Sequence, residues 1–266
     1  MKNTQIISVI NQKGGVGKTT TVINLSTALS FYKKKVLVID LDPQGNATTG
    51  FGLSNNDDSK TIYDVLNGNS NFEDAIKDTK VNNLKLVSSN VDLSGIEVEA
   101  ASENRRAFLL KDKIENFING PKNDFSYIFI DCPPSLSLLT IMSLVVAKSL
   151  IVPLQAEFFA LEGLSQLLKT IDRIKIKLNP DLEIRGVLLT MFDKRNKLSA
   201  QVDAEARKFL KEKVYETVIP RNVRLSEAPS HGVPILIYDK LCAGSRSYSN
   251  FAEEFLKQEN IMESAA

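Results

Sequence analysis

A glycine-rich loop, residues 13–20, has the residue types that bind a polyphosphate together with a metal ion. Its glycines allow backbone conformations that a Cβ would forbid, so several N–H groups can turn toward one anion. Lys18 would bridge the β- and γ-phosphates of a nucleotide, and the Thr19 hydroxyl would hold Mg²⁺. The loop residues expected to contact the nucleotide are Lys13, Gly14, Gly15, Val16, Gly17, Lys18, Thr19 and Thr20.

The sequences on either side of the loop predict the two elements that must position it. Residues 5–10 are apolar and β-branched, as in a buried parallel strand, and Val22, Leu25 and Leu29 recur at helical spacing. A strand, loop and helix in this order point the positive end of the helix at a bound anion. This setting argues against a surface loop that only happens to be rich in glycine.

Acidic residues follow the next predicted strand. Residues 36–40 form an apolar strand that ends at Asp40, and Asp42 follows it in a run of turn-forming residues. Parallel strands end at the edge of the sheet where open α/β proteins bind ligands, so a carboxylate there could orient water or hold the metal shell. The same residues are good turn formers in their own right, and their spacing leaves both interpretations open.

Another strand, residues 127–131, ends in an acid that is followed by a cysteine and two prolines. The prolines would stop the strand and stiffen the next loop, and the strand would aim Asp131 at Mg²⁺ through a water. A lone acid at a strand end is more often a cap or turn residue. Paired with the glycine-rich loop, it predicts a magnesium site at Thr19 and Asp131, with Asp42 as a further candidate ligand.

The loop departs from the usual phosphate-binding pattern at one position. That pattern requires a glycine where this chain has Gln12, and a second lysine, Lys13, stands beside it. With this lysine the loop resembles the deviant Walker A motif of the ParA/MinD family of ATPases, closest to the short chromosomal ParA type also called Soj. The resemblance covers nearly the whole chain, and its other motifs are residues 40–46, 131–135, 160–164 and 219–232.

This resemblance implies a role for individual residues of the nucleotide site. Lys13 would reach across a dimer to the partner's nucleotide, and Glu157 would border the dimer interface. Lys13, Lys18 and Asp42 would serve catalysis, with Asp42 positioning the attacking water. The adenine pocket would be walled by Pro220, Arg221 and Asn222.

Two arginines, Arg195 and Arg224, fall where resembling chromosomal proteins carry arginines needed for DNA binding. A guanidinium can fork two phosphate oxygens without reading base sequence, although a surface salt bridge is the commoner fate of an exposed arginine. From Lys169 to Arg224 the chain has 14 Lys+Arg against 8 Asp+Glu, within a chain of net charge +1. This bias is consistent with a basic face and also with a solvated helix surface.

Length and composition are those of an ordinary soluble globular protein, with 43% hydrophobic and 24% charged residues in a chain of 266. The predicted fold is α/β, with a doubly wound, mostly parallel sheet and helices on both faces, of the P-loop NTPase type. We expect one ATPase domain over residues 1–258, with residues 52–80 as a peripheral insertion and residues 259–266 as a frayed tail. Cys132 is expected to be a small core residue, and residues 214–219 are expected to form a further strand.

The resemblance implies a partitioning ATPase for a chromosome or plasmid, with ATP and Mg²⁺ as cofactors. ATP would join two copies into a sandwich dimer, and the dimer would bind double-stranded DNA non-specifically. Hydrolysis, slow alone and stimulated by a ParB-like partner, would release it. We expect a cytoplasmic protein, because no apolar run approaches the roughly 18 residues of a membrane span. The resemblance further implies that it associates with the nucleoid.

Three other functions share parts of this pattern. A membrane-cycling ATPase of the MinD type uses a basic amphipathic C-terminal helix, whereas residues 253–263 of this chain carry four glutamates. In a switch that binds ATP and DNA without hydrolysis, Asp42 would have no attacking water to position. A relative of the nitrogenase iron protein would need a cluster shared across the dimer, and Cys132 and Cys242 form no evident cluster pair.

Overall fold

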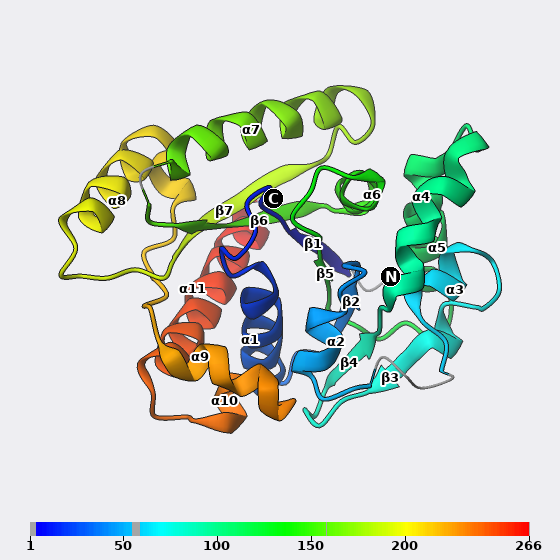
Figure 1. Ribbon diagram of the computed structural model, residues 1–266, viewed down its shortest axis with the longest axis horizontal. Coiled ribbons are helices and arrows are strands. Elements are labelled where there is room, and N and C mark those ends of the chain that lie inside the picture. The colour runs from blue at the N-terminus through cyan, green and yellow to red at the C-terminus, as the bar shows by residue number, and fades with distance from the viewer. Residues whose placement is uncertain (1–3, 55–58, 158, 266) are drawn as a thin grey trace.

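The computed structural model describes residues 4–54, 59–157 and 159–265. A seven-stranded sheet has the order β3-β4-β2-β5-β1-β6-β7 (Figure 1). β3 is antiparallel to β4, and all other neighbours in the sheet are parallel. The strands are β1 (Gln5–Val9), β2 (Val36–Asp40), β3 (Ile76–Asp78), β4 (Leu84–Val87), β5 (Tyr127–Asp131), β6 (Ser149–Gln155) and β7 (Glu183–Thr190).

The register of the central strands brings their carboxyl ends together. β2 and β5 are buried along their whole length, as their apolar sequences predict. Val9 at the end of β1 lies opposite Asp131, and Asp40 at the end of β2 lies opposite the same Asp131. The predicted strand-ending acids therefore meet at the edge of the sheet where the glycine-rich loop begins.

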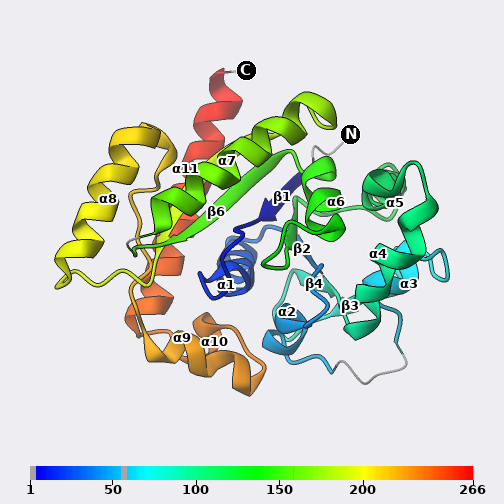
Figure 2. The same ribbon diagram turned by 45° about the horizontal axis from the view of Figure 1, so that its top comes forward.

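Helices cover both faces of the sheet, which confirms the predicted fold class. Alternate residues of one strand serve the two cores, since Leu37 and Ile39 pack on one face and Val36 and Val38 on the other. Figures 1 and 2 show α7 and α8 on one side and α9 and α10 on the other. One face carries α3 (Ile62–Leu66), α4 (Ile96–Glu99), α5 (Leu109–Ile118), α6 (Leu138–Val146), α7 (Ala160–Lys177) and α8 (Lys197–Leu210). The other carries α1 (Lys18–Phe31), α2 (Asn46–Gly50), α9 (Val223–Glu227), α10 (Ile235–Tyr238) and α11 (Ala243–Ala265).

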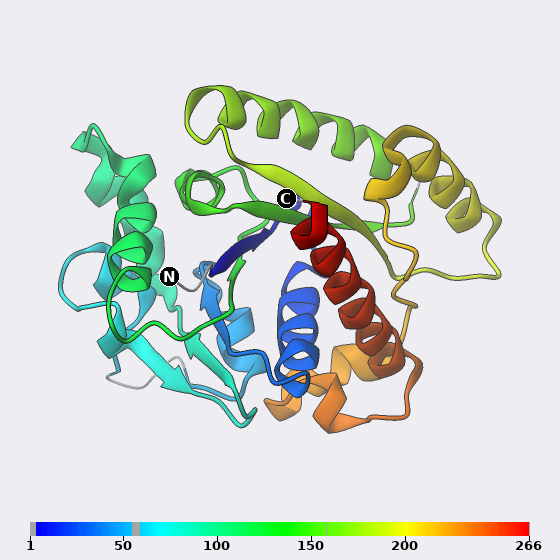
Figure 3. The ribbon, with the colours of Figure 1, turned by 180° about the vertical axis from the view of Figure 1, so that it is seen from behind.

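The helix that follows the glycine-rich loop, α1, is enclosed by the sheet and by α11, which runs beside it (Figure 3). Of its 14 residues, 11 are buried. The Thr21 hydroxyl lies 3.1 Å from the Tyr248 hydroxyl on α11, and Asn24 accepts a hydrogen bond of 2.9 Å from the Ile235 N–H. These contacts fix the position of the helix and of the loop at its N-terminus.

Residues 214–219, whose sequence predicts a further strand, do not form one. The Tyr215 and Ile219 N–H groups bond to β7 carbonyls, but the Glu216 and Thr217 N–H groups donate to the carboxylate of Glu254 on α11, at 2.7 and 2.9 Å. A side chain from a distant helix thus takes the donors that would continue the ladder. Among the described residues, isolated bridges remain between Val214 and Val187 of β7 and between Pro220 and Phe192, which follows β7.

Residues 52–80, which we expected to be a peripheral insertion, supply α3 and the edge strand β3, and Ile62 and Val65 of α3 are fully buried. In the segment expected to fray, residues 259–265 belong to α11, which ends at Ala265. Glu259 on this extension forms an ion pair of 3.7 Å with the buried Arg185, which holds the helix against the sheet. Within the described ranges, no helix combines the length and the apolarity that a bilayer crossing requires.

Two glycines provide a matched test of the packing. A Cβ added to Gly186 on β7 would lie 2.4 Å from the Tyr215 ring, whereas one added to Gly163 on α7 would meet nothing within 4 Å. Gly186→Ala should lower the free energy of unfolding by about 1–3 kcal/mol through overpacking. Gly163→Ala should raise it by about 0.5–1 kcal/mol, because glycine is a poor helix former. Urea denaturation without nucleotide measures both, and equal effects would contradict this packing.

Candidate nucleotide-binding site

The glycine-rich loop is shaped by two left-handed glycines and by hydrogen bonds to neighbouring strands. Gly15 has φ 72° and Gly17 has φ 90°, a region that residues with a Cβ rarely adopt. The Thr190 hydroxyl donates to the Val16 carbonyl at 2.8 Å. Asn11 accepts from the Lys13 N–H at 2.9 Å and donates to the Pro153 carbonyl at 2.7 Å. The loop is therefore held open at the N-terminus of α1, as anion binding requires.

Lys18 is buried at the base of the loop, where its Nζ donates to the Lys13 carbonyl at 3.1 Å. Burial lowers the pKa of Lys18, and the negative charges of Asp131 and Asp42 act in the opposite direction. A cation held in this position by its own loop is well placed to bind phosphate oxygens.

Two adjoining hollows give the site the dimensions of a nucleotide. One, of about 440 Å³, lies over the loop and is lined by Lys18, Thr19 and Asp42 among others. The other, of about 490 Å³, contains Pro220, Arg221 and Asn222 in its lining. Both hollows are bordered by Gly17, Thr20, Met191 and Pro229, so they form one continuous site.

The second hollow has an acceptor that suits an adenine base. Asn222 Oδ1 is buried, and the described part of the chain offers it no hydrogen-bond partner. Adenine carries an exocyclic amino group that can donate to such an oxygen, whereas guanine presents a carbonyl oxygen at the equivalent position. Asn222 therefore fits a base that donates a hydrogen bond.

Asp131 has the properties of a metal-shell ligand. It is fully buried, and by distance and angle neither carboxylate oxygen is hydrogen bonded among the described residues, although the Thr19 hydroxyl lies close enough to lower the pKa of Asp131. Burial raises its pKa well above the usual value, and the neighbouring Asp40 raises it further. A buried, unpaired carboxylate is costly, so an Mg²⁺ ion with its waters next to Thr19 would fit this side chain.

Sequence spacing did not distinguish the roles of Asp40 and Asp42, but the structure does. Asp40 accepts hydrogen bonds of 2.8 Å from both the Thr48 N–H and the Thr48 hydroxyl, so it anchors α2. Burial raises its pKa to about 6. Asp42 lines the hollow over the loop and holds the following turn by accepting from the Gln44 N–H at 3.0 Å. Of the two, Asp42 is the one that faces the nucleotide site.

Lys13 does not line the hollow over its own loop. Its Nζ forms an ion pair of 2.5 Å with Glu157, and both side chains are about half exposed, at 49% and 45%. The Gln155 amide donates to the same carboxylate. The structure thus brings the two residues expected at a dimer interface into direct contact on the surface.

The expected DNA contacts, Arg195 and Arg224, lie outside the nucleotide site. Arg195 follows β7 and is 91% exposed, whereas Arg224 is on α9 and is 53% exposed. A groove of about 630 Å³, lined by Lys194, Arg195 and Arg221 among others, adjoins the adenine-side hollow at Pro220. The basic surface is therefore continuous with one wall of the nucleotide site.

Several residues of the site escaped the sequence analysis. Asn46, Thr49, Pro229 and Ser230 line the hollow over the loop. The first two follow the strand-ending acids and the last two lie in a quoted motif, so they could have been found. Met191, which borders both hollows with φ 50°, gives no such signal, because nothing in a methionine predicts a left-handed backbone.

Comparison with known proteins agrees with this geometry. The family described as an AAA domain matches residues 4–184. The chromosome partitioning protein ParA of Caulobacter vibrioides is 49% identical over 263 residues, which is 98% of this chain and 97% of that protein. The sporulation initiation inhibitor protein Soj of Bacillus subtilis is 49% identical over 250 residues, 94% and 97% of the two chains. The chain belongs to the ParA family.

A solved structure with a similar fold contains a nucleotide and magnesium. Cobyrinic acid a,c-diamide synthase of Mycobacterium smegmatis, with bound ADP and magnesium, superposes with a TM-score of 0.84 at 33% identity. The match covers 97% of this chain and 96% of that one. A fold of this kind therefore accommodates a nucleotide with magnesium.

Cys132 is the small core residue that the sequence predicts. It is buried, and its Sγ lies 3.0 Å from the Ser143 hydroxyl. Burial raises the pKa of its thiol to about 12, so it stays protonated. A protonated core thiol is a poor ligand for an iron–sulfur cluster, which argues against the iron-protein alternative.

The unpaired state of Asp131 predicts a pH-dependent stability. Its raised pKa means that the folded state binds this proton more tightly than the unfolded state, so stability falls as pH rises above the ordinary carboxyl pKa of about 4. Without nucleotide at pH 7, Asp131→Asn should be more stable than wild type by about 1–2 kcal/mol. The gain should shrink as pH falls toward about 4.

Thermal denaturation from pH 4 to 8, with and without ATP and Mg²⁺, measures this effect. Wild type should gain stability from Mg²⁺, and Asp131→Asn should lose that gain. Asp78→Asn, which removes an exposed carboxylate on β3, is the matched control and should change neither property. A loss of stability in Asp131→Asn at pH 7 would show that the carboxylate is satisfied inside the fold.

Proposed function

We propose that this protein is a partitioning ATPase whose ATP-bound dimer binds DNA non-specifically and is released by hydrolysis. The observation that carries the proposal is the different position of two lysines in one loop. Lys18 supplies the cation inside the hollow, while Lys13 lies at the surface beside Glu157. A second lysine that does not serve its own nucleotide is available to the nucleotide of another copy.

Dimerisation would follow from this geometry because ATP would be bound by both chains. The Lys13 side chain is half exposed, and its ion pair with Glu157 is a surface interaction that contributes little to stability. Exchange of that carboxylate for a partner's phosphates would therefore cost little. Glu157 would remain at the interface, where the partner's loop would approach.

Hydrolysis would use electrostatics and positioning rather than a strong base. A bound Mg²⁺ would neutralise developing charge on the phosphates, with Thr19 and Asp131 holding its shell. Lys18 would bind phosphate oxygens from within the loop. Asp42 would orient the attacking water, and its fixed turn at Gln44 keeps the carboxylate at the hollow. Such a site would be slow alone and open to stimulation by a partner.

DNA binding would come from Arg195 and Arg224, which contact phosphates without reading bases. A dimer would double these contacts, and the second set would bind as an intramolecular event. ATP would thus control DNA affinity through the number of arginines rather than through new chemistry. The name of the Caulobacter vibrioides relative, a chromosome partitioning protein, supports a role in partitioning. A ParB-like centromere-binding partner and a position on the nucleoid complete the proposal.

A MinD-like membrane cycle has less support from the C-terminal helix. Phe251 and Phe255 of α11 are buried against the domain, and Glu253 and Glu254 bond to Tyr32 and to the Glu216 N–H. A helix packed in this way does not offer an apolar face to lipid. Sedimentation with anionic liposomes and ATP separates the two functions, and strong pelleting would favour the membrane cycle.

The catalytic part of the proposal predicts a separation of binding from turnover. Asp42→Asn keeps an oxygen acceptor for the Gln44 N–H but removes the charge that would orient water. Phosphate release in the presence of DNA should fall by about 100-fold, while ATP-dependent DNA binding should persist. Asp181→Asn, at an exposed position, is the control. Wild-type turnover in Asp42→Asn would remove this residue from the mechanism.

The DNA-binding part predicts a nucleotide-dependent and salt-dependent affinity. Binding of a random-sequence duplex, measured with ATP, with ADP and without nucleotide, should be strongest with ATP. Arg195→Ala and Arg224→Ala should each weaken it about tenfold or more at low salt and reduce its salt dependence. Arg105→Ala, which removes a 71% exposed arginine elsewhere, serves as control. If both variants bind like this control, the DNA-face assignment is wrong.

A further inference from the structure

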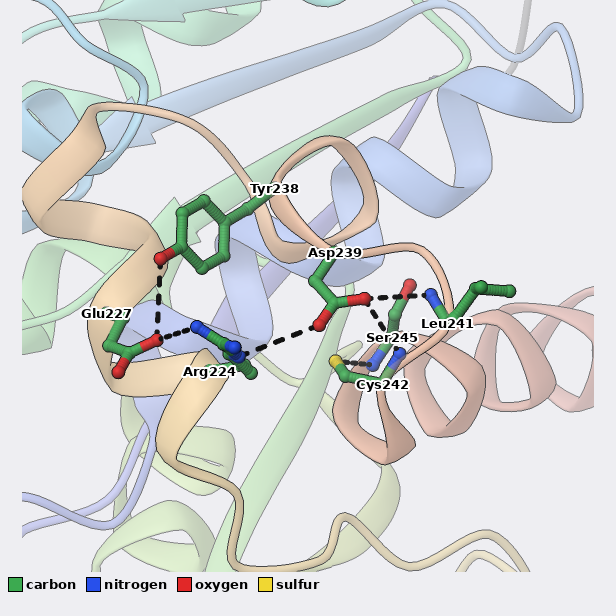
Figure 4. Close-up of polar contacts among 7 residues, drawn as sticks. All are labelled: Arg224, Glu227, Tyr238, Asp239, Leu241, Cys242 and Ser245. Carbon is green, nitrogen blue, oxygen red and sulfur yellow. Dashed lines mark hydrogen bonds and ion pairs between the residues drawn. The ribbon is translucent and has the colours of Figure 1, made fainter.

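Each of the two proposed DNA-binding arginines is already paired with carboxylates of its own chain. Arg224 Nη1 lies 2.8 Å from Glu227 Oε2, and its Nε lies 3.7 Å from Asp239 Oδ2. Figure 4 shows the guanidinium between these two acids, which come from α9 and from the end of α10. At neutral pH this trio has a net charge of −1, so its local field opposes the approach of a phosphate.

The two acids beside Arg224 are held in place by other contacts (Figure 4). Asp239 Oδ1 accepts hydrogen bonds of 3.1 Å from both the Leu241 and the Cys242 N–H groups. Glu227 Oε2 also accepts a bond of 3.4 Å from the Tyr238 hydroxyl. Because the acids are fixed by these contacts, they will not swing away when a phosphate approaches.

Arg195 has a comparable partner in Asp193. Its Nε and Nη2 donate to the two oxygens of Asp193, both at 3.0 Å, in the bidentate geometry that a phosphate would otherwise use. The Arg195 N–H also donates to this carboxylate, at 3.0 Å. Hydrogen bonds from Arg195 lower the pKa of Asp193 to about 2, so the acid keeps its charge throughout the neutral range.

We propose that Asp193, Glu227 and Asp239 attenuate DNA binding by competing with phosphate for Arg195 and Arg224. The inference rests on the proposed function of these arginines. A phosphate must displace Asp193 from the fork of Arg195, and it must approach Arg224 against two fixed negative charges. One protomer would therefore hold DNA too weakly to stay bound, and two linked protomers would be required.

This attenuation has a consequence for the ATP cycle. If a single protomer bound DNA strongly, hydrolysis and separation of the dimer would not release it. The acids keep the affinity of each protomer so low that a single protomer dissociates from DNA, whereas the doubled contacts of the dimer still hold it. The acids thus determine how completely the protein releases DNA when the dimer separates.

The test uses isosteric amides that remove charge and keep the local acceptors. Asp193→Asn, Glu227→Gln and Asp239→Asn are compared with Glu183→Gln, which removes one exposed charge at the opposite end of β7 from Arg195. Fluorescence anisotropy of a random-sequence duplex is measured with ADP and with a non-hydrolysable ATP analogue. Unchanged nucleotide binding and circular dichroism verify that each variant is folded.

With ADP, each of the three variants should bind DNA about threefold to tenfold more tightly than Glu183→Gln, because a phosphate then meets an uncompensated guanidinium. With the ATP analogue, the gain should be multiplied over two protomers. In combination with Arg224→Ala, Glu227→Gln and Asp239→Asn should gain no more than Glu183→Gln, because the group they compete for is absent.

Four results would overturn the inference. Affinities equal to that of Glu183→Gln would show that the acids do not compete, and weaker binding would show that they orient the arginines for DNA. A gain that persists with Arg224→Ala would show that Glu227 and Asp239 act elsewhere. If Arg195→Ala and Arg224→Ala bind like wild type, the DNA face itself is misassigned and both proposals fail, whereas the first three results leave that face intact.

Discussion

The enclosure of α1 is the constraint on which the rest of the nucleotide site depends. The helix is clamped between the sheet and α11, with polar contacts from Thr21 to Tyr248 and from Asn24 to the Ile235 N–H. It therefore cannot tilt or shift without opening the core. Its N-terminus and the loop before it are fixed before any ligand arrives, so little ordering entropy remains for a nucleotide to overcome.

The second feature of the site is a charge distribution that is incomplete without ligand. Asp40 and Asp131 are buried side by side at the strand ends. Lys18 is also buried, and its positive charge lowers the pKa of Asp131. Only Asp40 has its hydrogen bonds satisfied by the fold. Burial of the Asp131 carboxylate costs free energy, which a metal ion bound beside it would offset. This unsatisfied group therefore contributes to the ligand specificity of the fold.

The sequence predicted most of the elements that position this site, because their signals are local. β2 and β5 are continuous apolar runs that end in acids. The spacing of the glycines in the loop suggested the left-handed dihedral angles that Gly15 and Gly17 adopt. The predicted strand over residues 214–219 failed because Glu254, almost forty positions away, takes its donors. Periodicity carries no information about such a contact.

The electrostatic partners of the functional side chains were also beyond the sequence. Neither the pairing of Lys13 with Glu157 nor that of Arg224 with Asp239 follows from spacing, since the partners come from separate elements that only the fold brings together. Asp193 and Glu227 lie two and three positions from their arginines, so the sequence contained a local signal that the resemblance to DNA-binding arginines overshadowed. Lys13, Arg195 and Arg224 are thus each paired with an acid of their own chain.

The account depends on one event, the joining of two copies by a nucleotide that both chains bind. Sedimentation velocity at micromolar protein, with a non-hydrolysable ATP analogue and Mg²⁺, measures it most directly. The account predicts a dimer with the analogue, a monomer with ADP, and a monomer in both conditions for Lys13→Ala even though that variant still binds nucleotide. A monomeric wild type at saturating analogue would contradict it.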